Sequence, residues 1–340
     1  MNSEQRKTVY EVIRENLKGN ELPSDFSLEE HTEGIHFAPG AEDGILFFHT
    51  AHSEPDEDAR QAVRSALHTA CLGDYETAEH LFKEASEKIR ALFSIRIIEE
   101  YLNEASEEEI GQSYAFAMNV LRNSSDPDTV KFALAVLGMF GIDNPNDQKV
   151  IRTLALYDDF TFLAACSMKH WKNGEWYIYN TLKNVHGWGR IFGILLFEPT
   201  DKLMEHWLLM EGIHNEVMPE YSALECYEKA KVRQYLQKLV RDKEFNAITE
   251  ILSALVQTEV PVANIYDVDD WRGMLKEYLD RAKEERRSIT VYQFIKRIQE
   301  FAEEANETEL AQSAKAVLSS EACRTIMNEE SAENGDTDPA

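Results

Sequence analysis

The chain has few cysteines and no long apolar run. Its cysteines, Cys71, Cys166, Cys226 and Cys323, are dispersed and never stand in a C-x-x-C spacing, which argues against a zinc ribbon, a thioredoxin-type centre or a disulfide framework. The longest apolar runs, such as residues 191–197, fall far short of the roughly 20 residues that a membrane-spanning helix needs. The N-terminal residues lack the apolar core and small-residue cleavage site of a secretory signal. These absences predict a cytoplasmic protein.

Positive charge is also scarce. The 340 residues contain 35 Lys and Arg against 62 Asp and Glu, a formal net charge of -27. Such a surface repels phosphate groups, so nucleic-acid and membrane partners are disfavoured. No Lys or Arg stands between Lys18 and Arg60, where acidic residues gather beside four histidines, His31, His36, His49 and His52.

This acidic, histidine-rich segment, residues 21–58, differs from the rest of the chain. Its apolar residues form two short runs, GIHF and GILFF, on either side of the turn-forming APGAEDG. The pattern predicts a small β-hairpin or a structured loop. Residues 1–20 are predicted to hold a helix, and residues 321–340 a disordered acidic tail, because the last thirteen residues, NEESAENGDTDPA, contain little that is apolar.

Residues 59–320 have the pattern of a helical-repeat-like domain. In DARQAVRSALHTACL, apolar residues recur at steps of three and four, which places them on one face of a helix. Similar stretches follow at short intervals, separated by SSDP, DNP, EPTD and EVP. Without interleaved strands an α/β sheet is disfavoured. The predicted fold class is all-α, an irregular HEAT- or armadillo-like array, and an irregular helical bundle is the alternative.

Residues 184–230 contain many aromatic and polar residues that helix formation does not require. Gly187, Gly189 and Gly193 give G-x-G-x-x-x-G, one residue off a dinucleotide-binding turn. Residues 176–182 could supply the preceding strand, but the surrounding βαβ pattern is absent. The alternative is a tight turn between helices, with Trp188 plugging the core and Arg190 capping carbonyls or pairing with an acid.

The same block supplies the candidate site residues. An arginine, a histidine and a tyrosine near a glycine turn would suit an anion or an adenine-like ring. The candidate catalytic residues are His186, Arg190, His214 and Tyr221, the candidate cofactor-binding residues are Gly187, Gly189 and Asn215, and the candidate substrate-binding residues are Trp188, Phe192 and Trp207.

The block carries no G-x-S-x-G elbow and no Cys-His signature. A non-haem iron site needs two histidines and a carboxylate. His49 and His52 beside Glu54, or His206 and His214 beside Glu211 or Glu216, meet that inventory without a diagnostic spacing. No metal site is therefore predicted, and a metal or flavin cofactor is left open.

Two stretches carry a resemblance to a known family, HGWGRIFGILLFEPTDKLMEHWLLMEGIHNEVMPEYSALECYEKA and PGAEDGILFFH. They resemble a bacterial family of helical proteins often labelled limonene hydroxylase, and the similarity extends over about residues 34–256. The resemblance implies oxygenation of limonene to carveol and perillyl alcohol, followed by NAD-dependent dehydrogenation to carvone and perillyl aldehyde. NAD(P)H is the cofactor that it implies.

Two hypotheses of different class follow. In the first, an apolar pocket lined by Trp188, Phe192 and Trp207 holds a small hydrophobic substrate beside a cofactor. In the second, the helical array is a non-enzymatic scaffold that binds a protein or peptide, with Trp188, Arg190 and Tyr221 as anchors, since Trp, Tyr and Arg dominate binding energy at interfaces. The acidity of the chain favours a basic partner for such a scaffold.

Overall fold

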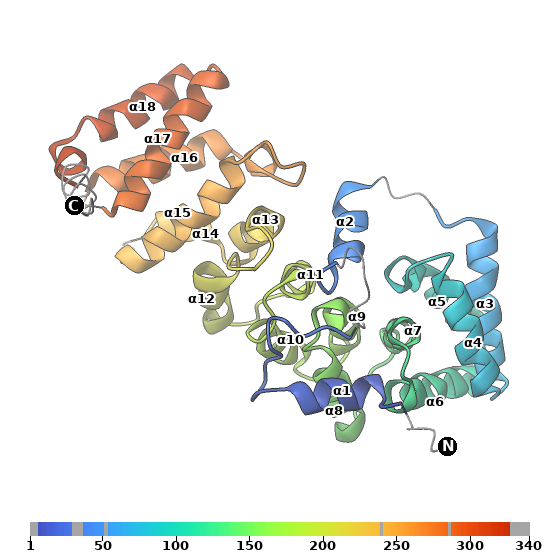
Figure 1. Ribbon diagram of the computed structural model, residues 1–340. Helices are drawn as coiled ribbons and strands as arrows, with labels where there is room; N and C mark the ends of the chain where they lie inside the picture. The colour runs from blue at the N-terminus through green and yellow to red at the C-terminus, as the bar shows by residue number, and fades with distance from the viewer. Residues whose placement is uncertain (1–5, 29–36, 51–53, 239–240, 285–286, 327–340) are drawn as a thin grey trace, which may run out of the picture. The chain divides into compact units, whose positions relative to one another are not determined.

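A computed structural model describes residues 6–28, 37–50, 54–238, 241–284 and 287–326. Every named element in these ranges is a helix (Figure 1), and the one β feature there is an isolated bridge between Lys18 and Glu21. The predicted all-α class is confirmed. The elements are α1 (Val9–Asn16), α2 (Ala41–His49), α3 (Glu57–Cys71), α4 (Tyr75–Ser86), α5 (Ala91–Glu104), α6 (Glu107–Asn123), α7 (Pro127–Leu137), α8 (Pro145–Leu154), α9 (Asp158–Met168), α10 (Gly174–Leu182), α11 (Trp188–Leu196), α12 (Lys202–Glu211), α13 (Glu220–Lys229), α14 (Val232–Leu236), α15 (Asp242–Val256), the 3₁₀-helix η1 (Ile265–Asp267), α16 (Trp271–Glu284), α17 (Ile289–Glu304) and α18 (Thr308–Leu318).

Helix starts follow the breakers in the sequence. Asp126 caps α7 by accepting from the Thr129 amide, and Pro127 occupies the first turn. Asn144 and Pro145 begin α8 in the same way, and Asp201 caps α12. Side-chain caps satisfy amides that have no partner within the helix, and proline fits the first turn because its missing N–H would be unpaired there anyway.

The chain divides into two compact units. Unit 1 comprises Met1–Glu198 and Asn215–Val217, and unit 2 comprises Pro199–His214 and Met218–Ala340. The sequence pattern indicates one helical region over residues 59–320, whereas the structure distributes these residues between the two units. The EPTD break at residues 198–201 contains the boundary.

Unit 1 is built from two layers of helices. In one layer α3, α5, α7, α9 and α11 pack in succession, and α4, α6, α8 and α10 cover them (Figure 1). Helix α7 lies in the middle of the first layer, and each of its residues from Thr129 to Leu137 is buried. The N-terminal ends of α5, α7 and α9 line one hollow and their C-terminal ends line another, so these helices run in the same direction.

Unit 2 repeats the layered packing. Helices α13, α15 and α17 pack in succession, as do α14, α16 and α18, and α12 packs on α13 and α15. Its core contains Phe245 stacked on Tyr278 with ring centroids 5.0 Å apart. The buried Tyr278 hydroxyl lies 2.8 Å from Thr249 Oγ1, so this polar group retains a hydrogen bond inside the core.

The structure corrects two local predictions. The run at residues 44–48, predicted to belong to a small β-hairpin or a structured loop, lies in α2. The first turn of α2 carries Glu42 and Asp43, and carboxylates stabilise a helix N-terminus. Residues 34–36 of the other run, with His31, His36 and His52, lie outside the described residues. Residues 176–182, which could have supplied the strand before a dinucleotide-binding turn, are in α10, in agreement with the absence of a βαβ pattern. The tail predicted over residues 321–340 begins as helix at residues 321–326, with Cys323 buried, and residues 327–340 lie outside the described ranges.

Among the described residues, no helix is long and apolar enough to cross a membrane.

Candidate functional site

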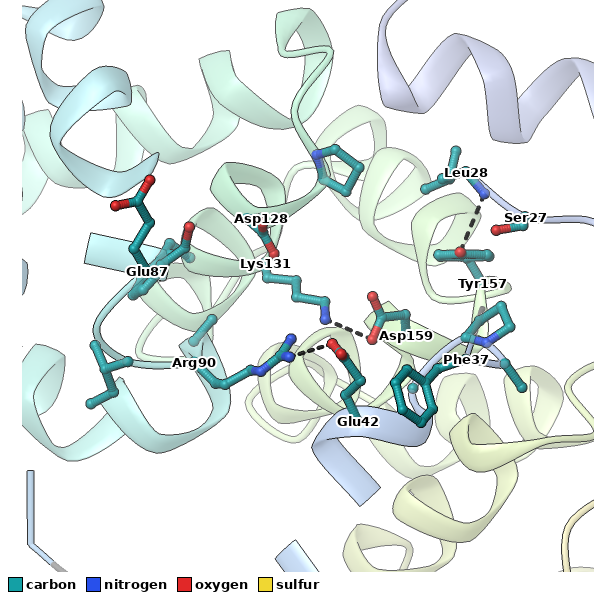
Figure 2. A pocket seen from close by; sticks show the side chains of 18 of the residues that line it. Ser27, Leu28, Phe37, Glu42, Glu87, Arg90, Asp128, Lys131, Tyr157 and Asp159 are labelled. Carbon is teal, nitrogen blue, oxygen red and sulfur yellow. Dashed lines mark hydrogen bonds and ion pairs between the residues drawn. The ribbon is translucent and has the colours of Figure 1, made fainter. Parts of the chain in front are cut away.

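Unit 1 contains a charged hollow at the N-terminal ends of its parallel helices. Its volume is about 820 Å³, and it is lined from the starts of α2, α5, α7 and α9 and from the segments at residues 27–28 and 37–40. In Figure 2, Lys131 and Arg90 extend into the middle of the hollow, with Phe37 and Tyr157 on one side. The Tyr157 hydroxyl accepts a hydrogen bond from the Leu28 amide, 3.3 Å away.

A network of ion pairs forms the floor of this hollow. Lys131 Nζ lies 2.6 Å from Asp159 Oδ1 and 3.3 Å from Asp43 Oδ2. Arg90 pairs with Glu42, and its Nε lies 3.5 Å from Asp43 Oδ1. Lys131 and Asp43 are buried. Removing one partner from such a buried network leaves an uncompensated charge, so the network constrains how α2, α5, α7 and α9 meet.

Carboxylates outnumber cations in this network. Burial opposes the charged form of Lys131, but Asp159 and Asp43 outweigh this effect and raise its pKa. Burial also raises the pKa of Asp159, and Lys131 offsets the rise only in part. Asp128 lines the hollow with an exposed side chain. Within the network, three carboxylates thus face the two cations, and Asp128 is an exposed carboxylate beside them.

A second recess adjoins the charged hollow at the start of α11. Asp158 Oδ1 accepts hydrogen bonds from the amides of Gly187, at 2.9 Å, and Gly189, at 2.7 Å. A Cβ at Gly189 would lie 2.8 Å from the Asp158 Cα and 2.4 Å from the Thr161 hydroxyl oxygen. Glycine is needed here because the backbone of α11 approaches α9 closely. Burial raises the pKa of Asp158 to about 6, even though these amides favour its charged form.

This geometry gives the G-x-G spacing a structural explanation. In a dinucleotide-binding turn, the amides at the helix N-terminus face a phosphate. Here the amides of Gly187 and Gly189 donate to Asp158, a carboxylate of the same chain. Arg190 is buried, and its Nε donates to the Val185 carbonyl at 2.8 Å. This contact agrees with the prediction that Arg190 caps backbone carbonyl groups.

Trp188 and Phe192 lie beneath α2. Gly44 of α2 approaches so closely that a Cβ there would lie 2.2 Å from Trp188 Cε3. Phe47 packs on Phe192 with ring centroids 5.5 Å apart, and Phe48 lies 6.2 Å from Trp188. The cavity that Phe192 lines measures about 10 Å³, which is the space of about one water molecule.

The remaining candidate residues divide between the units. His186 lines the second recess, whose volume is about 400 Å³, and its carbonyl accepts from the Glu216 amide at 2.7 Å. Asn215 Oδ1 accepts from the Val217 amide at 3.0 Å, which fixes the local turn. Unit 1 thus brings together His186, Gly187, Trp188, Gly189, Arg190, Phe192 and Asn215, whereas Trp207, His214 and Tyr221 belong to unit 2.

In unit 2, His214 is held between two carboxylates. Its Nε2 lies 2.9 Å from Glu250 Oε2 and its Nδ1 3.3 Å from Glu211 Oε2. These interactions raise the pKa of His214, with the Glu250 hydrogen bond as the larger cause. Burial raises the pKa of Tyr221. Trp207 is half-buried on α12.

The ion network of the charged hollow was not among the residues predicted to form a site. One sequence signal for it is Lys131 within the otherwise apolar run of α7, where a charge without a partner would be costly. The adjacent carboxylates Asp158 and Asp159 at the start of α9 are a second signal. The partners of both signals are distant in sequence, so their pairing becomes visible only in the fold.

An apolar hollow lies at the opposite ends of the same helices. Its volume is about 590 Å³, and its apolar lining includes Ile95, Leu102, Ile110, Met139 and Leu196. Among the described residues, no group of three or more His, Cys, Asp or Glu side chains could hold a metal ion.

Comparisons with protein-family models, with curated proteins and with solved structures find no match to this chain.

Proposed function

We propose that this protein is a helical binding module and that the charged hollow of unit 1 receives a basic side chain of a partner protein or peptide. The observation that carries the proposal is the surplus of carboxylates over cations around Arg90 and Lys131. Trp188 and Arg190, expected from the sequence as anchors, are buried. The proposed contact surface is therefore a different part of unit 1.

Asp128 is the residue best placed to contact the partner. Its side chain is exposed in the hollow, whereas Asp43 and Asp159 are engaged by Lys131. A guanidinium group could form a charge-assisted hydrogen bond with Asp128, a type of bond about twice as strong as a neutral one. The volume of about 820 Å³ lies within the range of ligand pockets. It suits a few side chains of an extended segment.

Binding of labelled peptides tests this proposal. Fluorescence anisotropy should compare peptides that carry Arg or Lys with peptides in which the same positions are Glu. We expect the basic peptides alone to bind, with affinity that falls as salt is added. Asp128→Asn should weaken binding about tenfold, or about 1.4 kcal/mol. The matched control is Glu76→Gln, an exposed carboxylate on α4, which should bind as the wild type does. Equal binding of both peptide classes, or an unaffected Asp128→Asn variant, would contradict the proposal.

A second candidate function is oxygenation of limonene to carveol and perillyl alcohol, with NAD-dependent dehydrogenation to carvone and perillyl aldehyde. The resemblance of residues 39–49 and 186–230 supports it, and the apolar hollow of about 590 Å³ offers a place for a terpene. Limonene should be incubated aerobically with pure protein, NAD(P)H, iron and flavin, with heat-killed protein as the control. Gas chromatography with mass spectrometry should then detect either alcohol at many turnovers per chain. Met139→Trp, which narrows the hollow, should abolish the product. Absence of product from folded wild-type protein would leave binding as the function.

A further inference from the structure

Helix α2 packs on other helices of unit 1 through contacts like those of a helical peptide bound to a protein surface. It contacts α11 and forms ion pairs with residues of α7 and at the start of α5. We propose that the surface under α2 is a helix-binding groove, that α2 occupies it within the chain, and that an acidic amphipathic helix of a partner protein binds there in its place. This inference does not depend on the binding of a basic segment in the charged hollow.

Steric fit is the first argument for a groove. Gly40 begins α2 with a positive φ of 81°, and a Cβ there would lie 2.9 Å from the Trp188 Cβ. Gly44, one turn later, lies against the indole ring. Glycine weakens a helix interior, so its presence at this position is explained by the close approach to Trp188.

Charge complementarity is the second argument. The first turn of α2 carries Glu42 and Asp43, and they face Arg90 and Lys131. Apart from α2, the ion-paired groups of this floor are the two cations and Asp159, which lies 2.6 Å from Lys131 Nζ, so one positive charge is left in excess. It matches carboxylates at the N-terminus of an incoming helix, where the helix dipole also favours negative charge.

Aromatic contacts set the register of the bound helix. Phe47 and Phe48 pack on Phe192, with ring centroids 5.5 Å and 6.1 Å away, and Phe48 also faces Trp188. The expected partner helix therefore begins with two acidic residues, continues with a small residue, and carries an aromatic pair one turn later. Apolar anchors at helical spacing are typical of helix-in-groove recognition.

The test uses the full chain and a peptide with the sequence of residues 38–50, APGAEDGILFFHT, carrying a fluorescent label. In the variant Gly44→Leu, the new side chain would collide with Trp188, so α2 should leave the groove. Ile45→Leu is the matched control, because Ile45 is 42% exposed. We expect the peptide to bind Gly44→Leu at least tenfold more tightly than it binds the wild type or the control. A peptide carrying the same Gly44→Leu change should not bind.

Two results would overturn the inference. One is equal peptide affinity, or no affinity, for all three proteins when circular dichroism shows them folded. The other is mixed dimers of wild-type and Gly44→Leu chains in light scattering without binding of free peptide, which would assign the groove to a second copy of the chain. If Gly44→Leu loses its helical signal, the double variant Glu42→Lys, Asp43→Lys takes its place with the same expectations, because it repels Arg90 and Lys131.

Discussion

Asp158 provides the sharpest test of how the start of α11 is held. Its carboxylate is partly buried and accepts hydrogen bonds from the amides of Gly187 and Gly189. Asp158→Asn keeps an oxygen that can accept both hydrogen bonds but removes the charge. Asp158→Ala removes the acceptor and leaves two buried amides without it, at a cost of about 1–3 kcal/mol for each amide.

The pKa of Asp158 determines the sign of the pH effect. Burial raises this pKa from 3.8 to about 6 in the folded chain. A raised pKa means that folding favours the protonated form, so the stabilisation is fully present below pH 4 and is lost as the pH rises to about 6. Since each pKa unit corresponds to about 1.4 kcal/mol, the loss amounts to about 3 kcal/mol. Asn cannot ionise, so Asp158→Asn should match the wild type below pH 4 and exceed its stability by up to about 3 kcal/mol at pH 7.

Urea unfolding between pH 4 and pH 7 measures this difference. Pulsed hydrogen exchange with mass spectrometry should follow peptides from α9 and α11, because a chain with two units need not unfold in one step. Comparing variant with wild type at each pH cancels the titration of other carboxylates. A constant difference between Asp158→Asn and the wild type from pH 4 to pH 7 would refute the role of ionisation. Equal stability of the Asn and Ala variants would refute the role of the hydrogen bonds.

Three further predictions concern packing and buried polar groups. Gly189→Ala should destabilise unit 1 by about 1–3 kcal/mol through overpacking. Gly111→Ala is the control, because a Cβ at Gly111 on α6 meets open space, and it should stabilise unit 1 by up to about 1 kcal/mol. Thermal unfolding of the two variants and the wild type measures both effects. Lys131→Met should cost about 3–5 kcal/mol because it leaves buried carboxylates unpaired, and unchanged urea unfolding would contradict this reasoning. Tyr278→Phe should destabilise unit 2 by about 1 kcal/mol through loss of the bond to Thr249, as read from exchange in α16, and no change there would argue against that bond.

Helix positions could be predicted from the sequence because their signals are local. The Asp126-Pro127 and Asn144-Pro145 pairs place the starts of α7 and α8 within a residue. Helix α2 could not be predicted, since a nine-residue element with two aromatic residues and an internal glycine has the composition of a strand between turns. Its helical form is stabilised by Trp188, Arg90 and Lys131, all far away in sequence.

The candidate site likewise combines a signal that is local in the sequence with contacts that are distant in the sequence. The density of glycine and aromatic residues identifies residues 184–230 as unusual, but the group that requires these glycines is Asp158, 29 and 31 residues earlier in the chain. Reading the glycines within their own block suggests a bound phosphate. Only the fold shows that a carboxylate of unit 1 receives the amides.

The two stretches that carry the resemblance meet in unit 1. Residues 39–49 contain Gly44 and residues 186–230 contain Trp188, and the backbone of the first lies on the indole of the second. Replacing either residue would disturb the packing of α2 on α11, so both would be retained by any protein that keeps this packing. Similarity in both stretches would therefore be expected of any protein with this packing, whatever its reaction. Residues that carry out a reaction would have to lie outside this packing. Met139→Trp in the apolar hollow and Asp128→Asn in the charged hollow therefore separate the two proposed functions, because neither substitution changes the packing of α2 on α11.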